Sequence, residues 1–140
     1  MAKKTKEEKE TKTSGKRKRA IAKATIKAGE GIVKINKIPY EHLQEFKKLM
    51  IQEPIEIAKQ VLGGFNFNIA VVVKGGGQSS QIEASRLAIA RALVNFTKSV
   101  ELRKKFLEYD RNLLIADVRR KEAYKPGDSK ARRKRQKSYR

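Results

Sequence analysis

The chain contains no cysteine and only one histidine among its 140 residues. The absence of cysteine excludes disulfide bonds, thiolate metal sites and cysteine nucleophiles. His42 has no second histidine or cysteine with which to share a metal ion, so we expect an exposed helix residue and no metal site. The acids Asp110 and Asp117 are followed by Arg111 and Arg119, a pattern typical of local ion pairs. Because no nucleophile–base arrangement is evident, we expect no catalytic residue, no cofactor and no small-molecule substrate.

Long apolar segments are also missing. No run approaches the roughly 20 apolar residues that a membrane-spanning helix requires. The first residues are charged and no hydrophobic stretch follows them, which does not fit a secretory signal. These absences favour a soluble intracellular protein.

Negative charge is scarce, above all near the two ends. The chain has 35 Lys and Arg against 15 acids, a net charge of +20, and the ranges 1–19 and 119–140 hold three quarters of that excess. The last eleven residues carry seven Lys or Arg and no acid, with only Ala131 and Tyr139 to bury. Such a segment does not fold alone, and it gains free energy by releasing counterions from nucleic acid. An anionic membrane is the competing partner, but anchoring there usually requires a second signal that the chain lacks.

The composition indicates three parts. We expect a disordered Lys- and Glu-rich leader over 1–15, a globular α+β domain over 16–118, and an extended basic tail over 119–140. Alternation from Arg19 to Lys27 predicts a strand with one basic face, which a turn at 29–31 would join as a hairpin to a short strand over 32–35.

The rest of the domain alternates helices and strands. Leu43, Phe46 and Met50 indicate one short helix, and Pro54 suits the first turn of a second. Apolar residues at odd positions predict a strand over 65–74, and a helical stripe predicts a long core helix over 79–97. Ser99 is expected to cap a further short helix that contains Leu102 and Phe106. The range 113–115 would form a last strand or a segment docked on the core.

A glycine-rich loop separates the predicted strand from the long helix. Its sequence is GGGQSSQ over residues 75–81. Free N–H groups and the dipole at a helix start favour anions, and glycine lets a phosphate approach the backbone. Three interpretations stay open: a tight turn alone, a contact with nucleic-acid phosphate, or a nucleotide loop similar to that of kinases of the galactokinase–homoserine kinase type. The loop is not a Walker A motif, because no Gly-Lys-Ser/Thr follows.

Two basic clusters complete the candidate interface. In a strand, alternate side chains share a face, so Arg17, Arg19, Lys23 and Lys27 are expected on one solvent face, as a phosphate footprint or as an ordinary solvated surface. In the tail, Arg132, Arg133 and Arg135 can bind phosphate bidentately, and Tyr124 and Tyr139 can stack on bases. A nuclear-localisation signal would explain the tail but not the strand face.

Four motifs in order resemble those of a known family. They are TSGKRKRAIAKA over 13–24, GGGQSSQ over 75–81, AIARAL over 88–93 and ARRKRQKSYR over 131–140. Together they resemble small-subunit ribosomal protein number nine in its archaeal form. Two positions depart from the pattern: the family loop usually has Gly where this chain has Ser80, and bacterial members usually have Lys where it has Tyr139.

The resemblance implies a fold and a function. The fold would be the two-layer α/β sandwich of the second domain of ribosomal protein number five, with a left-handed βαβ crossover, which the kinases named above share. The domain would bind ribosomal RNA in the head of the small subunit beside other ribosomal proteins, in the cytoplasm. The tail would reach the peptidyl-site tRNA, with Arg140 near the phosphates of the anticodon arm.

These interpretations predict two sets of binding residues. The residues expected to bind ribosomal RNA are Lys16, Arg17, Lys18, Arg19, Lys23, Gly75, Gly76, Gly77, Gln78, Arg119, Arg120, Lys121, Lys130, Arg132, Arg133, Lys134 and Arg135. Those expected to contact tRNA are Lys137, Ser138, Tyr139 and Arg140. The rival functions are a free-standing nucleic-acid binder and a small phosphotransferase built on residues 75–81.

Overall fold

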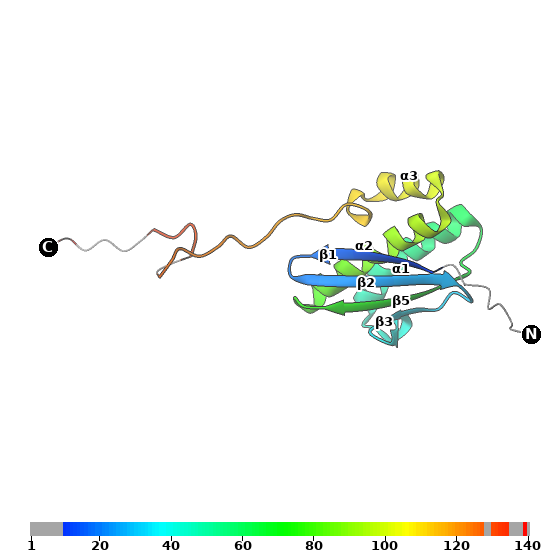
Figure 1. Ribbon diagram of the computed structural model, residues 1–140, viewed down its shortest axis with the longest axis horizontal. Coiled ribbons are helices and arrows are strands. Elements are labelled where there is room, and N and C mark those ends of the chain that lie inside the picture. The colour runs from blue at the N-terminus through cyan, green and yellow to red at the C-terminus, as the bar shows by residue number, and fades with distance from the viewer. Residues whose placement is uncertain (1–9, 128–129, 135–138, 140) are drawn as a thin grey trace, which may run out of the picture.

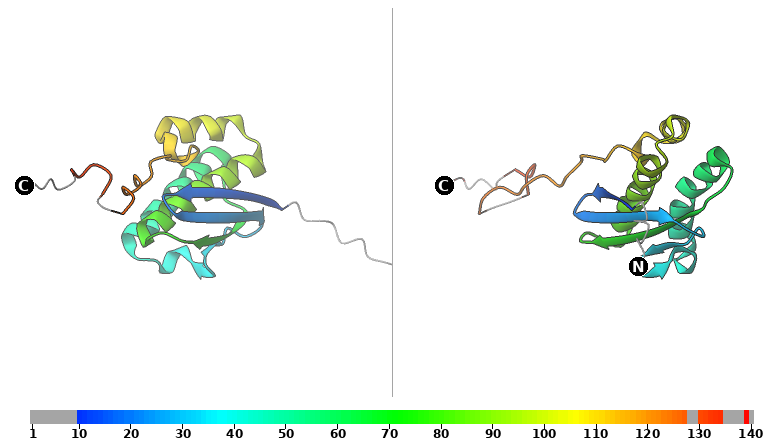
Figure 2. Two further views of the ribbon diagram at one scale, coloured as in Figure 1. Left: turned by 60° about the vertical axis from the view of Figure 1, so that its left-hand side comes forward. Right: turned by 45° about the vertical axis from the view of Figure 1, so that its right-hand side comes forward.

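One mixed sheet and three α-helices form the domain. The computed structural model describes residues 10–127, 130–134 and 139. The elements are β1 (Thr11–Arg17), β2 (Ala20–Ala28), β3 (Val33–Ile35), β4 (Ile38–Pro39), the 3-10 helix η1 (Tyr40–His42), α1 (Glu45–Leu62), β5 (Phe67–Lys74), α2 (Gln78–Thr97), α3 (Val100–Tyr109) and the 3-10 helix η2 (Arg111–Leu113). The strand order is β1-β2-β5-β3-β4, and α1 and α2 cover one face of the sheet (Figures 1 and 2). This arrangement confirms the predicted α+β class.

The central strands form as their alternation predicts. In β5, Ile69, Val71 and Val73 are buried while Val72 and Lys74 are exposed. β5 pairs antiparallel with β2 on one side and parallel with β3 on the other. The odd-numbered face of β5 therefore lies against the helices, and the even-numbered face forms part of the open side of the sheet.

The helix α2 packs closely on the sheet because small residues line the contact. Ala20, Ala22 and Ala24 of β2 and Ala84 and Ala88 of α2 are all buried. The predicted apolar stripe is confirmed: Ile89 and Leu93 are fully buried, and the Phe96 ring packs edge-on against Phe67 at 5.5 Å. This tight seating places the start of α2 beside the end of the sheet where β1 and β2 are joined.

The helix α3 and the segment after it close the core. The Ser99 hydroxyl accepts a hydrogen bond from the Leu102 N–H, which confirms the predicted cap, and Leu102 and Phe106 are fully buried. Leu113 is also fully buried, in the 3-10 helix η2. Leu113 therefore docks on the core and Leu114 packs against it, whereas Ile115 is exposed, and the range 113–115 is not a strand.

The prediction of two short helices divided at Pro54 is wrong. A single helix α1 runs through Pro54, which is buried inside it. Proline removes one backbone hydrogen bond, and its ring crowds the preceding turn. The helix continues because Ile51, Ile55 and Ala58, on both sides of the proline, bury one apolar face. Tertiary packing here outweighs the local preference.

The prediction of the first hairpin and of the leader boundary is also wrong. Residues 11–15, expected in a disordered leader, belong to β1, and the hairpin joins β1 to β2 rather than β2 to β3. β5 lies between β2 and β3. β1 has few apolar residues, so its order comes from pairing with β2 and packing on α2: the Thr13 hydroxyl donates to the Ala88 carbonyl at 3.0 Å. Residues 1–9 lie outside the described residues.

The described residues from 114 onwards contain no helix or strand. Leu114 still packs on the core and Asp117 pairs with Arg17 of β1, and after these contacts the chain extends away from the sheet and helices (Figure 1). In the part of the chain that the structure describes, no helix is long and apolar enough to cross a membrane.

Candidate nucleic-acid interface

The hairpin turn between β1 and β2 presents two cations at one end of the sheet. Arg17 pairs with Ala20, so Lys18 and Arg19 form the two-residue turn, and Lys18 adopts a left-handed backbone with φ 51°. Both turn residues are exposed. Neither side chain forms an ion pair with a described residue. These cations are therefore free to meet an external anion.

The glycine loop packs directly against this turn. Gly75 and Gly76 have φ values of 79° and 66°, in the left-handed region that favours glycine. A Cβ at Gly75 would lie 2.7 Å from the Arg19 carbonyl oxygen, and one at Gly76 would lie 3.0 Å from the Ala20 nitrogen. The Gln81 side chain donates to the Gly75 carbonyl at 3.1 Å. The glycines therefore allow the loop and the hairpin turn to lie side by side.

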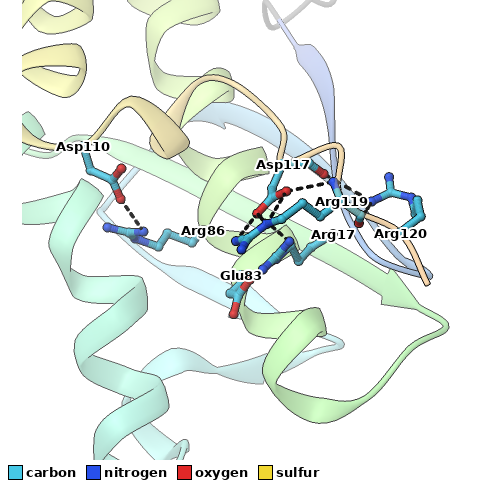
Figure 3. A network of polar contacts seen from close by, with 7 residues as sticks. All are labelled: Arg17, Glu83, Arg86, Asp110, Asp117, Arg119 and Arg120. Carbon is cyan, nitrogen blue, oxygen red and sulfur yellow. Dashed lines mark hydrogen bonds and ion pairs between the residues drawn. The ribbon is translucent and has the colours of Figure 1, made fainter. Parts of the chain in front are cut away.

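An ion-pair network attaches the start of the tail to the same place (Figure 3). Asp117 accepts from the Arg119 guanidinium at 2.6 and 2.9 Å and from the Arg119 backbone N–H at 2.9 Å. Its Oδ2 also lies 2.7 Å from Nη1 of Arg17, which contacts Glu83 of α2 as well. Arg120 donates to the backbone carbonyl of Asp117 at 3.2 Å. Asp117 thus joins β1 to the tail, and Arg17 extends the network to α2.

These contacts perturb the ionisation of Asp117. Hydrogen bonds from the Arg119 side chain, and then from its backbone N–H, hold the pKa of the Asp117 carboxyl far below its ordinary value of 3.8. The pKa of Arg119 is raised in return, mainly by the same hydrogen bond. Asp117 therefore stays ionised at physiological pH.

Together the three segments line a groove of about 700 Å³, which we call the basic groove. Its lining residues are Arg17, Lys18, Arg19, Gly76, Gly77, Ser80, Arg119, Arg120 and Lys121. Every charged side chain among them is a cation. The structure thus brings together residues that lie about 100 positions apart in the sequence. Gln78 lies beside the groove at the first turn of α2, where its side chain accepts from Lys47 at 2.7 Å.

The predicted basic strand face is correct in part. Lys23 and Lys27 lie on the open face of β2, and Lys16 lies on the same face of β1 opposite Ile21. Arg17 does not share this face, because it pairs with Ala20 and points towards the helices. The error arose from counting alternation through 18–19, where the chain reverses direction.

Other lysines on the open face were missed. Lys12 of β1, Lys34 of β3 and Lys74 of β5 are exposed there, at positions that alternate with buried or half-buried residues. Lys74 and Lys34 could have been found by extending the alternation argument to every strand. Lys12 could not, because it lay in the predicted leader. Glu10 lies 3.8 Å from Lys12 and 3.5 Å from Lys27.

The predicted tail residues lie only partly within the described structure. Lys130, Arg132, Arg133 and Lys134 are exposed, and Arg132 donates to Glu122 at 2.9 Å. Tyr139 is 89% exposed. The remaining predicted residues of the tail lie outside the described residues: Arg135, Lys137, Ser138 and Arg140.

The predictions for His42 and Asp117 agree with the structure, and the prediction for Asp110 does not. His42 is exposed in η1, as expected. The local pair of Asp117 with Arg119 is confirmed. Asp110 was expected to pair with Arg111 but pairs with Arg86 of α2 at 3.0 Å. The chain turn after α3 brings Asp110 back to α2, and nothing in the local sequence indicates this.

Comparison with known proteins identifies the family. A sequence profile described as ribosomal protein S9/S16 matches residues 15–140. The chain belongs to the ribosomal protein S9/S16 family. The small ribosomal subunit protein uS9 of Methanococcus maripaludis strain C7 is 47% identical over 131 residues, covering 91% of this chain and 96% of the relative. The protein of the same name from Methanococcus vannielii is 45% identical over the same length and coverage.

Membership of the S9/S16 family confirms the resemblance drawn from the four motifs. It also confirms the prediction of an archaeal-type ribosomal protein of the small subunit, located in the cytoplasmic ribosome. The S9/S16 family consists of structural ribosomal proteins and is not an enzyme family.

Proposed function

We propose that this chain is a structural constituent of the small ribosomal subunit that binds ribosomal RNA through the basic groove and the open sheet face, and contacts peptidyl-site tRNA through its tail. The observation that carries the proposal is the basic groove, where cations from the hairpin turn and the tail meet the glycine loop. Phosphate contacts of this kind position a protein on RNA, largely by shape. Neighbouring ribosomal proteins complete its surroundings.

The division of charge supports this function. The domain supplies a rigid scaffold, since α2 and β1 are tied by packing and by the Arg17–Glu83 pair. The range 119–140 carries eleven Lys or Arg against two acids. A segment of this composition orders on a polyanion and neutralises phosphate where a rigid element does not reach.

The experiment that tests ribosomal RNA binding neutralises the hairpin turn. We expect Lys18→Gln/Arg19→Gln to weaken binding to small-subunit RNA and to make its salt dependence shallower. Each lost phosphate contact lowers the slope of log K against log salt by about 0.7–0.9, so two contacts lower it by roughly 1.4–1.8. Fluorescence anisotropy at several salt concentrations measures both quantities.

A matched control lies on α3. Arg103 and Lys104 are adjacent and exposed on α3, and neither lines the basic groove. Arg103→Gln/Lys104→Gln removes the same two charges, and we expect a smaller loss of affinity. Equal losses in the two double variants would show that net charge, not the groove, determines binding, and would contradict the proposal.

Two further measurements address the ribosome and tRNA. At high salt the protein should stay with the small subunit at one copy in a sucrose gradient, whereas the rival free-standing binder would wash off. Deleting 137–140 should weaken peptidyl-site tRNA binding while subunit assembly continues, because these residues are expected at the tRNA. Unchanged tRNA affinity would contradict the proposed contact between the tail and tRNA.

A further inference from the structure

The open face of the sheet contains a small apolar hollow at Ala70. Ala70 of β5 pairs with Thr25 of β2 on one side and with Lys34 of β3 on the other. Its methyl group is shorter than either neighbouring side chain, so the surface is depressed there. The hollow has a volume of about 190 Å³, against ~30 Å³ for one water molecule in the liquid. We call it the sheet hollow, and its lining residues are Thr25, Lys27, Ile32, Lys34, Asn68, Ile69 and Ala70.

Ile32 lines the sheet hollow and is fixed by its backbone. Its N–H donates to Oδ1 of Asn68 at 3.0 Å, and its carbonyl accepts from the Ile69 N–H at 2.9 Å. The side chain nevertheless stays uncovered, since Ile32 is 43% exposed. A rigid apolar side chain beside an apolar hollow loses little conformational entropy when a ligand packs against it. The sheet hollow is therefore preorganised for an apolar surface from outside the chain.

Asn68 adds a hydrogen-bond donor to this apolar surface. Its Oδ1 accepts from the backbone N–H groups of both Glu30 and Ile32 at 3.0 Å. These two donors determine the orientation of the amide, so Nδ2 is the free end. Nδ2 donates to no residue within the described part of the chain. Gly29 permits this position, because a Cβ there would lie 2.1 Å from Nδ2. An apolar ligand with an acceptor atom on its edge can therefore use this donor as well.

The charges around the sheet hollow are positive. Lys27 and Lys34 line it, and no carboxylate does. Lys34 forms no ion pair with a described residue, whereas Lys27 lies 3.5 Å from Glu10 and keeps 45% of its side chain exposed. Lys23 lies on the same face of β2. An anion attached to the apolar ligand would therefore be attracted on both sides of the hollow.

A nucleotide matches this combination of an apolar hollow and flanking cations. Bare phosphate gains nothing from an apolar surface, and an apolar side chain gains nothing from two lysines. A nucleobase has two apolar faces and acceptor atoms on its edge, and RNA attaches an anionic phosphate on either side of it. Bases of single-stranded RNA turn out and pack on protein surfaces, whereas bases of a duplex stay stacked.

We propose that the sheet hollow binds one unstacked base of RNA. The base lies against Ala70 and Ile32, and an acceptor on its edge meets Nδ2 of Asn68. Lys27 and Lys34 contact the phosphates on either side. This inference rests on the proposed function and deepens it: the lysines of the open sheet face attract the RNA backbone, and the sheet hollow selects a single-stranded segment over a duplex.

The test fills the sheet hollow without changing charge. Ala70→Ile places a larger side chain in it, and Ala28→Ile is the matched control, because Ala28 is exposed at the end of β2 and does not line the hollow. We expect Ala70→Ile to lower affinity for small-subunit RNA about fourfold, the effect of about one buried methylene-sized contact, and Ala28→Ile to change it by less than about twofold. The salt slope in fluorescence anisotropy should be unchanged in both variants, because no cation is lost.

Stability and a second variant exclude a folding effect. β-branched residues are favoured in strands, so Ala70→Ile should unfold at the same or a higher urea concentration than the unsubstituted protein. Ile32→Ala removes an apolar contact and keeps the backbone hydrogen bonds of residue 32, so it should also fold and should bind RNA more weakly. RNA affinity that is unchanged in both Ala70→Ile and Ile32→Ala would overturn the site.

Methyl resonances identify what enters the sheet hollow. A methyl group that packs on the face of a ring is shifted by the ring current, so the Ala70 and Ile32 methyl signals should shift with a short oligoadenylate. The same strand without its bases, and inorganic phosphate, should leave these signals in place. Equal shifts with the abasic strand would contradict a base site. A tighter response to an acidic peptide that contains phenylalanine would overturn the assignment to RNA and indicate a protein partner.

The variants also separate this inference from the proposed function. If Lys18→Gln/Arg19→Gln loses affinity but Ala70→Ile and Ile32→Ala do not, the proposed function stands and this inference fails. If none of these variants loses affinity, both fail.

Discussion

The packing of β1 on α2 makes Gly15 the most sensitive position for a single methyl group. Gly15 is buried, and a Cβ there would lie 2.3 Å from the Ala84 carbonyl oxygen, 2.8 Å from the Ala88 nitrogen and 3.2 Å from the Ala88 Cβ. Two of these neighbours are helix backbone, which does not rotate away as a long side chain does. In Gly15→Ala, therefore, β1 must move away from α2 by about 1 Å to restore ordinary contact.

The loss of unfolding free energy that this movement causes can be estimated from its separate contributions. Overpacking of a tight contact typically costs about 1–3 kcal/mol. The shift also strains two hydrogen bonds that hold β1, from the Thr13 hydroxyl to the Ala88 carbonyl at 3.0 Å and from Arg91 to the Ser14 carbonyl at 2.9 Å. Replacing glycine stiffens the unfolded chain and offsets about 0.4–1 kcal/mol. We expect a net loss of roughly 1–2 kcal/mol, which lowers the melting temperature of a domain this size by about 4–16 °C.

Urea unfolding followed by circular dichroism measures this change. Gly64→Ala is the matched control, because a Cβ at Gly64 meets nothing within 4 Å and its φ lies outside the left-handed region. We expect that variant to unfold at the same urea concentration or slightly above it. If Gly15→Ala unfolded within about 0.5 kcal/mol of the unsubstituted protein, β1 would not pack on α2, and the disordered leader predicted over 1–15 would be the better description.

Three further predictions concern the tail, acid and α3. Asp117→Asn should weaken RNA binding although it adds positive charge, because Arg119 and the tail lose their anchor on Arg17; tighter binding in anisotropy would refute the anchoring role. Folding lowers the pKa of Asp117, so the ionised carboxylate stabilises the fold at pH values above its ordinary pKa of 3.8. This stabilisation is lost as the pH falls towards the lower pKa of the folded state. The difference in urea stability between the unsubstituted protein and Asp117→Asn should therefore shrink below about pH 4, and a constant difference would contradict this. Ser99→Ala should cost about 0.5–2 kcal/mol of unfolding free energy because the Leu102 N–H loses its acceptor, and Ser99→Asp should restore most of it; two variants of equal stability would argue against the cap.

Local sequence patterns predicted a helix or strand correctly where that element buries one regular face. The odd-numbered residues of β5, the apolar stripe of α2 and the cap of α3 all appear as expected, since each depends on side chains within a few positions. The concentration of cations near the two ends was likewise visible without coordinates. It indicated nucleic acid, and the ordered motifs indicated the family that was then confirmed.

Local sequence patterns failed to predict the structure where an element distant in sequence supplies the stabilising contacts. β1 has too few apolar residues for its alternation to predict a strand, and it is ordered by pairing with β2 and packing on α2. Pro54 looked like a helix start, yet the buried face on both sides of it continues through the proline. Counting alternation across the turn at 18–19 put Arg17 on the wrong face.

Composition, short-range periodicity and the ordered motifs were therefore enough to predict the class of fold and the family, because both depend on residue types and on spacings of a few positions. The tertiary structure alone shows how the cations are arranged. It placed Lys18, the start of α2 and Arg119 around one groove, and it turned Asp117 into the link between β1 and the tail. Packing of β1 and β5 on α2 sets the distances between these charges, and sequence separation does not encode those distances.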